Sequence, residues 1–110
     1  MTKLGPAVAE QDLDQLTNLF RLLADKTRLN ILLALAAGER NVGSLCQELR
    51  LPQPTVSHHL GLLRFHNIIT NRRRGKHVFY SLNGALTMGN GPVLEIALEN
   101  YSVRLACRVV

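Results

Sequence analysis

The segment from Asn41 to Leu82 carries the strongest structural signals and reads NVGSLCQELRLPQPTVSHHLGLLRFHNIITNRRRGKHVFYSL. Its first part predicts a short helix capped by Asn41, because Asn accepts hydrogen bonds well at a helix N-terminus. The sequence LPQP then interrupts the pattern. A second helix is predicted from about Pro54 to Phe65, since proline is tolerated in a first turn. Two short helices joined by a tight turn predict a helix-turn-helix.

The second of these helices has an apolar face and a polar face. Three apolar residues recur at helical spacing and should pack inward: Val56, Leu60 and Leu63. This leaves the polar face free to enter a groove. Strand-prone segments follow at 70–73 and 78–82, on either side of Arg74-Gly75-Lys76, where Gly75 suits a turn with positive φ. A basic hairpin directly after such a helix is predicted to be a wing.

Length and charge limit what the chain can do. Its 110 residues leave room for one domain, and we expect 1–110 to form a single unit. Thirteen Lys and Arg against eight Asp and Glu give a net charge of +5, which favours a polyanionic partner. Five of the thirteen cations fall within thirteen residues, so the excess is local, as a phosphate-binding edge requires: Arg64, Arg72, Arg73, Arg74 and Lys76.

Two further helices are predicted before this stretch. The first covers 12–24, where apolar residues recur at steps of three and four. Asp25 is suited to cap a second, strongly apolar helix. This helix should end at Gly38, the residue type that best adopts a left-handed helix end.

The C-terminal part is predicted to contain a linker and one more helix. The linker, rich in Gly and Asn, covers 83–91, and Pro92 can start the last helix. The apolar face of that helix is as large as the helix itself and needs a partner. We therefore expect the two ends of the chain, about 11–24 and 91–108, to pair with their counterparts in a twofold homodimer.

The remaining composition excludes several classes of protein. Cys46 and Cys107 are too few and too far apart for a secreted disulfide framework, and there is no CxxC pair. No apolar run approaches the roughly 20 residues of a membrane span, and the N-terminus lacks a signal-peptide core. We expect a cytoplasmic protein that does not bind membranes. Without a Gly-rich phosphate loop or a nucleophile elbow, catalysis is not expected either.

Three segments together resemble the ArsR (SmtB-type) family of winged helix-turn-helix repressors. They are VGSLCQELRLPQPTVSHHLGLLRFHNII, RRRGKHVFYSL and LADKTRLNILLAL, and the resemblance is clear over 19–82. It implies a mainly α fold with one β-hairpin, in the order of four helices, two strands and a fifth helix. It also implies a homodimeric repressor that releases a pseudo-palindromic DNA operator when a signal arrives, with 41–82 as the DNA-binding part.

The resemblance also implies roles for particular residues. Four residues match positions that face the major groove in the family: Gln53, Thr55, Ser57 and His58. Of these, Ser57 and His58 are the best candidates for base contact. His59 has two interpretations, packing or phosphate contact. Five basic residues should lie against phosphates or in the minor groove: Arg64, Arg72, Arg73, Arg74 and Lys76. The alternative is a basic hairpin that is only solvated and contacts no DNA. Pro52 departs from the family, because many relatives have a capping Ser there.

The signal that such a repressor would sense is not evident, and no metal or cofactor is expected. Metalloid sensors of the family carry three Cys near the third helix, but this chain has Asn41 and Gly43 in place of the first two and keeps only Cys46. Zinc sensors place His on the last helix, and no His occurs between Pro92 and Val110. His66 and His77 are interpreted as surface or DNA-proximal residues.

Two alternatives to a plain repressor remain open from the sequence. One is a thiol-based sensor for oxidants, persulfides or metalloids at Cys46 or Cys107, two residues that could form a disulfide only with Cα atoms within about 7 Å. The simpler interpretation of Cys46 is a buried small apolar side chain. The other alternative is a winged-helix protein-interaction module that no longer binds DNA.

Overall fold

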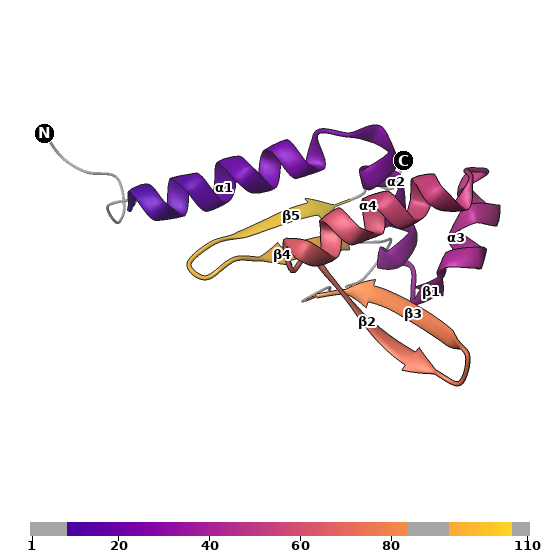
Figure 1. The fold of residues 1–110 in the computed structure, drawn as a ribbon. Helices are drawn as coiled ribbons and strands as arrows, with labels where there is room; N and C mark the ends of the chain where they lie inside the picture. Colours follow the sequence, from indigo (N-terminus) through magenta and orange to yellow (C-terminus); the bar gives the residue numbers. More distant parts are fainter. Residues whose placement is uncertain (1–8, 84–92, 107–110) are drawn as a thin grey trace, which may run out of the picture.

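The computed structural model describes residues 9–83 and 93–106 and contains four helices and five strands within them (Figure 1). In chain order these are α1 (Glu10–Leu23), α2 (Lys26–Ala36), β1 (Arg40–Asn41), α3 (Val42–Leu49), α4 (Gln53–Phe65), β2 (Ile69–Arg74), β3 (His77–Leu82), β4 (Val93–Ala97) and β5 (Ser102–Ala106). The linker was predicted at 83–91, and all of it after Asn83 lies outside the described residues.

The predicted helix caps of α2 and α3 are confirmed. Asp25 accepts a hydrogen bond from the backbone N–H of Arg28 at 3.0 Å, and Asn41 accepts one from the N–H of Ser44 at 2.8 Å. Each cap satisfies one of the N–H groups that a helix N-terminus leaves without a partner. Gly38 follows α2 with φ +152°, a backbone conformation that favours glycine.

The predicted helix-turn-helix consists of α3 and α4. Arg50 ends α3 in the left-handed conformation, with φ +55°. Pro52 then occupies the N-cap of α4 in an extended conformation, without a side-chain cap. Its carbonyl still accepts a hydrogen bond from the N–H of Val56 at 3.2 Å, so α4 forms normally despite the missing Ser.

The predicted wing is the antiparallel pair of β2 and β3, with Arg74 opposite His77 across a two-residue turn. Gly75 has φ +60° in this turn, as expected of a glycine in a tight hairpin. The sequence did not predict β1, which pairs with β3 and places Asn41 opposite Phe79. This third strand attaches the wing to the start of α3.

The predicted last helix is wrong, because the structure has a second β-hairpin, β4 and β5, at that place. The segment VLEIALENYSVRLA fits both the period of a helix and the alternation of a strand. Leu94 and Ile96 alternate with polar or small residues and are buried, as in a half-buried strand. Glu95 stands opposite Arg104 and accepts two hydrogen bonds from it, at 2.8 and 3.1 Å. A cross-strand pair of opposite charges stabilises a hairpin and has no counterpart at this spacing in a helix.

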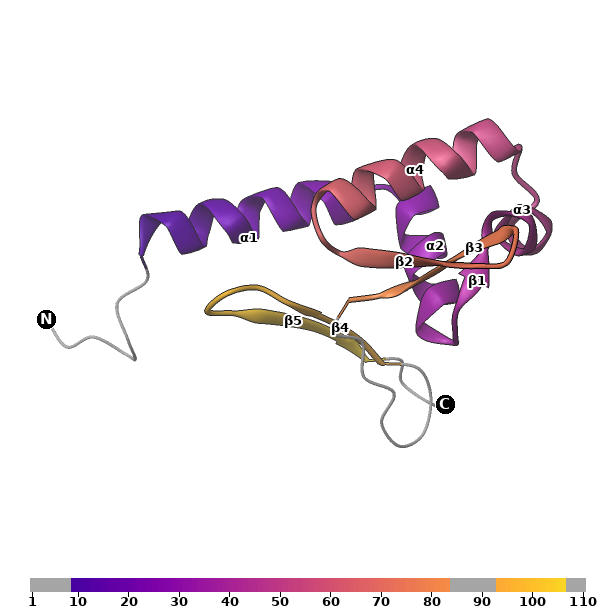
Figure 2. The same cartoon turned by 60° about the horizontal axis from the view of Figure 1, so that its bottom comes forward.

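The core lies between the helices and both hairpins. Its fully buried side chains include Ile31, Leu32, Leu45, Leu60, Leu63, Ile69 and Leu94. Figures 1 and 2 show the β4–β5 hairpin running alongside α1, with its tip pointing away from the tip of the wing. At the hairpin turn the Asn100 amide donates a hydrogen bond to the buried carboxylate of Asp12 at 3.0 Å.

One face of α1 is not covered by the rest of the described chain. Leu19 and Leu23 are buried in the core, but Leu13 and Phe20 are 51% and 55% exposed. They lie seven residues apart and therefore on the same side of the helix. None of the helices in the described part of the chain is long and apolar enough to cross a membrane.

Candidate nucleic-acid interface

The two faces of α4 are arranged as predicted. Val56, Leu60 and Leu63 are buried in the core, which fixes the helix on the domain. Ser57 and His58 are exposed on the other side, Gln53 is exposed at the first turn, and Thr55 is half-buried. Gly61 continues the exposed face, and a Cβ built there would meet no atom within 4 Å. The N-terminal half of α4 thus offers amide, hydroxyl and imidazole groups on an unobstructed surface.

His59 lies apart from this surface. It is half-buried, and its Nδ1 lies 3.3 Å from Nη1 of Arg28. A guanidinium can only donate, so this hydrogen bond requires Nδ1 to carry no proton. Arg28 also donates from Nε to the carbonyl of Leu22 at 2.6 Å and lies 3.8 Å from the carboxylate of Asp25. This network joins α4 to the start of α2 and favours packing as the role of His59.

Two of the three wing arginines are bound to one carboxylate. Arg72 donates from Nε to Oε2 of Glu39 at 2.9 Å and from Nη2 to Oε1 at 3.1 Å, and Nη1 of Arg74 lies 4.0 Å from the same Oε1. The hydrogen bonds from Arg72 hold the pKa of the Glu39 carboxyl below its usual value. The same contact raises the pKa of Arg72. Glu39 is therefore ionised at neutral pH.

The third wing arginine belongs to the other face of β2. Side chains alternate along a strand, so Arg73 shares a face with Asn71 and not with its two neighbours. Asn71 accepts a hydrogen bond from Nε of Arg64 at 3.0 Å, which places this face of β2 toward α4. Arg73 and Lys76 are exposed and form no ion pair with any described residue.

Glu39 and Asn71 were missed by the sequence reasoning. Glu39 lies 33 residues before Arg72 in the link between α2 and β1, and β1 brings the two together by pairing with β3. Its only sequence signal is its negative charge close to a predicted helix end. Asn71 lies inside the predicted strand, but its bond to Arg64 depends on the angle between α4 and the wing.

The candidate sensor residues form no common site in the described part of the chain. Cys46 on α3 is a free, half-buried thiol that packs against the core. Cys107 lies outside the described residues, so the possible pairing of the two cysteines stays a prediction. His66 follows α4 and His77 begins β3, both exposed. Among residues 9–83 and 93–106, no three His, Cys, Asp or Glu side chains are grouped so that they could hold a metal ion.

The helix pair α3–α4 followed by the β2–β3 hairpin defines a winged helix-turn-helix protein. A profile of bacterial regulatory proteins of the arsR family matches residues 25–70. The transcriptional repressor SdpR of Bacillus subtilis is 34% identical over 68 residues, which cover 62% of this chain and 76% of that protein. The chain belongs to the ArsR family.

Solved structures of similar proteins are consistent with the same assignment. The transcriptional repressor BigR of Xylella fastidiosa matches with a TM-score of 0.64 at 38% identity, over 69% of this chain and 75% of that one. The DNA-binding domain Mb0332 of Mycobacterium bovis, described as homodimeric and as a possible ArsR-family regulator, matches with a TM-score of 0.63 at 30% identity. That match covers 70% of this chain and 74% of the domain.

Proposed function

We propose that this protein is a homodimeric transcriptional repressor that binds a pseudo-palindromic DNA operator. The observation that carries the proposal is the exposed polar face of α4, which stands opposite the buried Val56, Leu60 and Leu63 and next to a basic wing. An α-helix fits the major groove of B-DNA, where each base pair presents a distinct pattern of donors and acceptors. Such a regulator acts where the chromosome lies, so the expected cytoplasmic location is part of the same proposal.

Base reading falls to the first half of α4. Ser57 and His58 are exposed on the free face and can exchange hydrogen bonds with base edges. Gln53 at the start of the helix and the half-buried Thr55 suit the rim of the groove, where amide and hydroxyl groups contact phosphates. His59 supports α4 from behind through Arg28.

Phosphate binding falls to the wing and to Arg64. Arg73 and Lys76 present cations without a partner among the described residues and can contact DNA directly. Arg64 can use its terminal nitrogens while its Nε holds Asn71. Arg72 and Arg74 are different, because each must share its charge between Glu39 and a phosphate.

The proposed homodimer forms through α1. Leu13 and Phe20 expose a large apolar surface on one side of this helix, and a second copy would bury it. A similar protein described as homodimeric supports the homodimer, although not the choice of α1 as its interface. A twofold dimer places two α4 helices on half-sites about one helical turn, near 34 Å, apart. The double variant Leu13→Asp, Phe20→Asp should sediment as a monomer and lose operator affinity, whereas a variant that remains a dimer would contradict the role of α1.

The reading function is tested by the double variant Ser57→Ala, His58→Ala. Discrimination between operator and random DNA should fall, because a good base contact contributes about fivefold or more to discrimination. The control is Arg73→Ala, Lys76→Ala, which should weaken binding to both DNAs alike and flatten the salt dependence. Unchanged sequence preference in the first variant, measured by anisotropy titration, would rule out α4 as the reading helix. Failure of the unaltered protein to bind its own promoter would favour an interaction module.

A further inference from the structure

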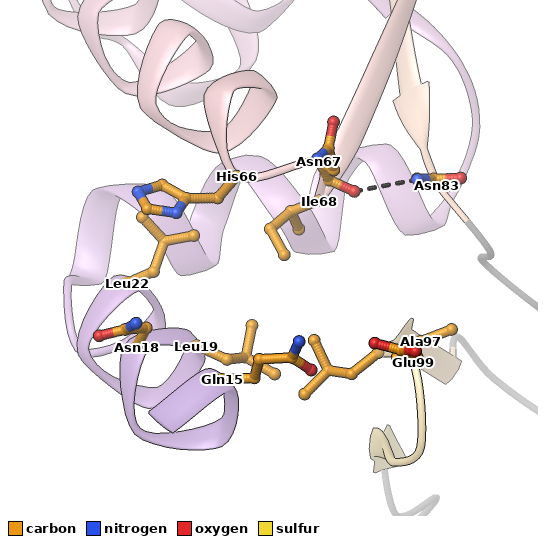
Figure 3. A pocket seen from close by; sticks show the side chains of 11 residues that line it. Gln15, Asn18, Leu19, Leu22, His66, Asn67, Ile68, Asn83, Ala97 and Glu99 are labelled. Atoms are coloured by element: carbon orange, nitrogen blue, oxygen red, sulfur yellow. Dashed lines mark hydrogen bonds between the residues drawn. The ribbon is translucent and has the colours of Figure 1, made fainter. Parts of the chain in front are cut away.

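A pocket of about 320 Å³ opens where α1, the end of α4 and the β4–β5 hairpin meet (Figure 3). Asn18, Leu22 and His66 stand on one side of it, and Ala97 and Glu99 stand on the other. Its volume is near the lower end of the roughly 300–1,000 Å³ that small-molecule sites occupy. The pocket exists because the C-terminal segment folds as a hairpin beside α1.

The rim of the pocket is held by the backbone that leaves α4. Asn67 has φ +60° and turns the chain from α4 into β2. Its carbonyl accepts a hydrogen bond from the Asn83 side chain at 3.0 Å (Figure 3). The backbone N–H of Asn83 donates to the carbonyl of Ile68 at 3.0 Å. The pocket wall is thus continuous with the end of the helix proposed to read DNA.

The pocket and the proposed dimer surface lie on opposite sides of α1. Successive residues are about 100° apart around a helix, so Gln15, Asn18 and Leu22 lie on one side. Leu13 and Phe20 lie on the other, roughly half a turn away. Dimerisation through the apolar side therefore leaves the pocket accessible.

The lining indicates the chemistry of the ligand. Leu19, Leu22, Ile68 and Leu98 offer an apolar floor, while side-chain amides of Gln15 and Asn18 offer hydrogen bonds. None of the described side chains that line the pocket is Lys or Arg, and its one carboxylate, Glu99, forms no ion pair with a described residue. His66 is the only described lining side chain that can carry a positive charge, so the preference of the pocket for a cation over an anion depends on Glu99.

We propose that this pocket binds a small organic amine, with its apolar frame on the leucine floor and its ammonium group near Glu99, and that binding weakens DNA affinity. The regulatory part rests on the proposed function, whereas binding itself does not. A ligand here touches both the helix of the proposed dimer and the end of α4, so it acts on their relative placement. This assigns an entry point for a signal to a chain whose sequence lacks the Cys and His patterns expected of the family's metal sensors.

The experiment uses three probes on one indole frame: tryptamine, the neutral alcohol tryptophol and the anion indole-3-acetate. Calorimetric titration of the full chain without DNA should give the order tryptamine, then tryptophol, then indole-3-acetate. Glu99→Gln should weaken tryptamine about twofold to fivefold, as expected for an exposed ion pair, and leave tryptophol unchanged. The matched control is Glu10→Gln, which removes an exposed carboxylate from the start of α1 and should change neither.

Several results would overturn the proposal. These are no saturable tryptamine binding at millimolar concentration, equal or tighter binding of indole-3-acetate, or unchanged tryptamine affinity in Glu99→Gln. Saturating tryptamine should also weaken operator binding by about fivefold or more, and the operator should weaken tryptamine by the same factor. An unchanged operator affinity would overturn the regulatory part. If the protein binds no DNA at all, the proposed function fails, but the titration without DNA still tests the pocket.

Discussion

Glu39→Gln should increase DNA affinity, because Glu39 competes with phosphate for the wing arginines. Arg72 donates two hydrogen bonds to this carboxylate, and Arg74 lies within 4.0 Å of it. The amide of the variant side chain could still accept one hydrogen bond but would carry no charge. Both arginine side chains are more than half exposed, so phosphate can reach them without a change in the fold.

The size of the effect follows from the exposure of the pair. An exposed ion pair changes an equilibrium about twofold to fivefold, and a dimer contains two such pairs. The affinity should therefore rise about fourfold to 25-fold at low salt, equally for operator and random DNA, since phosphates carry no sequence information. Each newly neutralised phosphate steepens the slope of log affinity against log salt by about 0.9. Two subunits should steepen it by up to about 1.8.

The assay is anisotropy titration of labelled duplex DNA at several KCl concentrations. Glu48→Gln is the matched control, because Glu48 is also exposed and accepts a hydrogen bond at 2.8 Å from Arg40 of β1, which is not one of the wing arginines. It corrects for the general effect of removing one negative charge. Arg72→Ala should cost more affinity in the Glu39→Gln background than in the unaltered protein.

Three outcomes would refute this reasoning. If Glu39→Gln binds DNA no better than Glu48→Gln, the carboxylate does not compete with phosphate. If it binds more weakly, Glu39 positions Arg72 for the DNA and supports binding. Additive effects of Glu39→Gln and Arg72→Ala would show that the pair is not coupled in the complex.

Three further predictions concern the fold. Leu94→Ala should lower the free energy of unfolding, measured by urea titration, by about 2–5 kcal/mol. Leu105→Ala, at a 40% exposed position, should change this free energy far less. Equal effects of the two substitutions would contradict the packing of β4 on the core. Asn41→Ala should lower the free energy of unfolding by about 1 kcal/mol through loss of the α3 cap, and no change would contradict that cap. The backbone N–H of Arg28 lowers the pKa of the Asp25 carboxyl. The ionised carboxylate therefore stabilises the folded state above its ordinary pKa of about 4, and this stabilisation is lost as the pH falls further. The difference in urea midpoint between the unaltered protein and Asp25→Ala should accordingly be constant from pH 6 to 8 and shrink below about pH 4.

Much of the proposed interface could be predicted because its signals are local. The helical spacing of Val56, Leu60 and Leu63 defines which side of α4 is buried and therefore which side is free. Gly75 between two strand-prone segments defines the wing, and Asn41 marks the start of α3. Each of these features depends on residues within a few positions of one another, so the sequence alone was sufficient.

The final element could not be predicted in the same way. The segment from Val93 to Ala106 fits a helical stripe as well as an alternating strand. The strands are stabilised by the burial of Leu94 and Ile96 against distant parts of the chain and by the Asn100 bond to Asp12, across 88 positions. Propensity is a weak guide where such tertiary contacts decide.

Local periodicity and turn chemistry are enough to predict the helix-turn-helix, the wing and the concentration of positive charge along it. The difference among the three wing arginines follows from tertiary contacts, because Glu39 reaches two of them through the pairing of β1 with β3. Tertiary contacts also place a hairpin and not a helix beside α1, which creates the pocket. Both depend on side chains far apart in sequence, whose contacts exist only once the chain has folded.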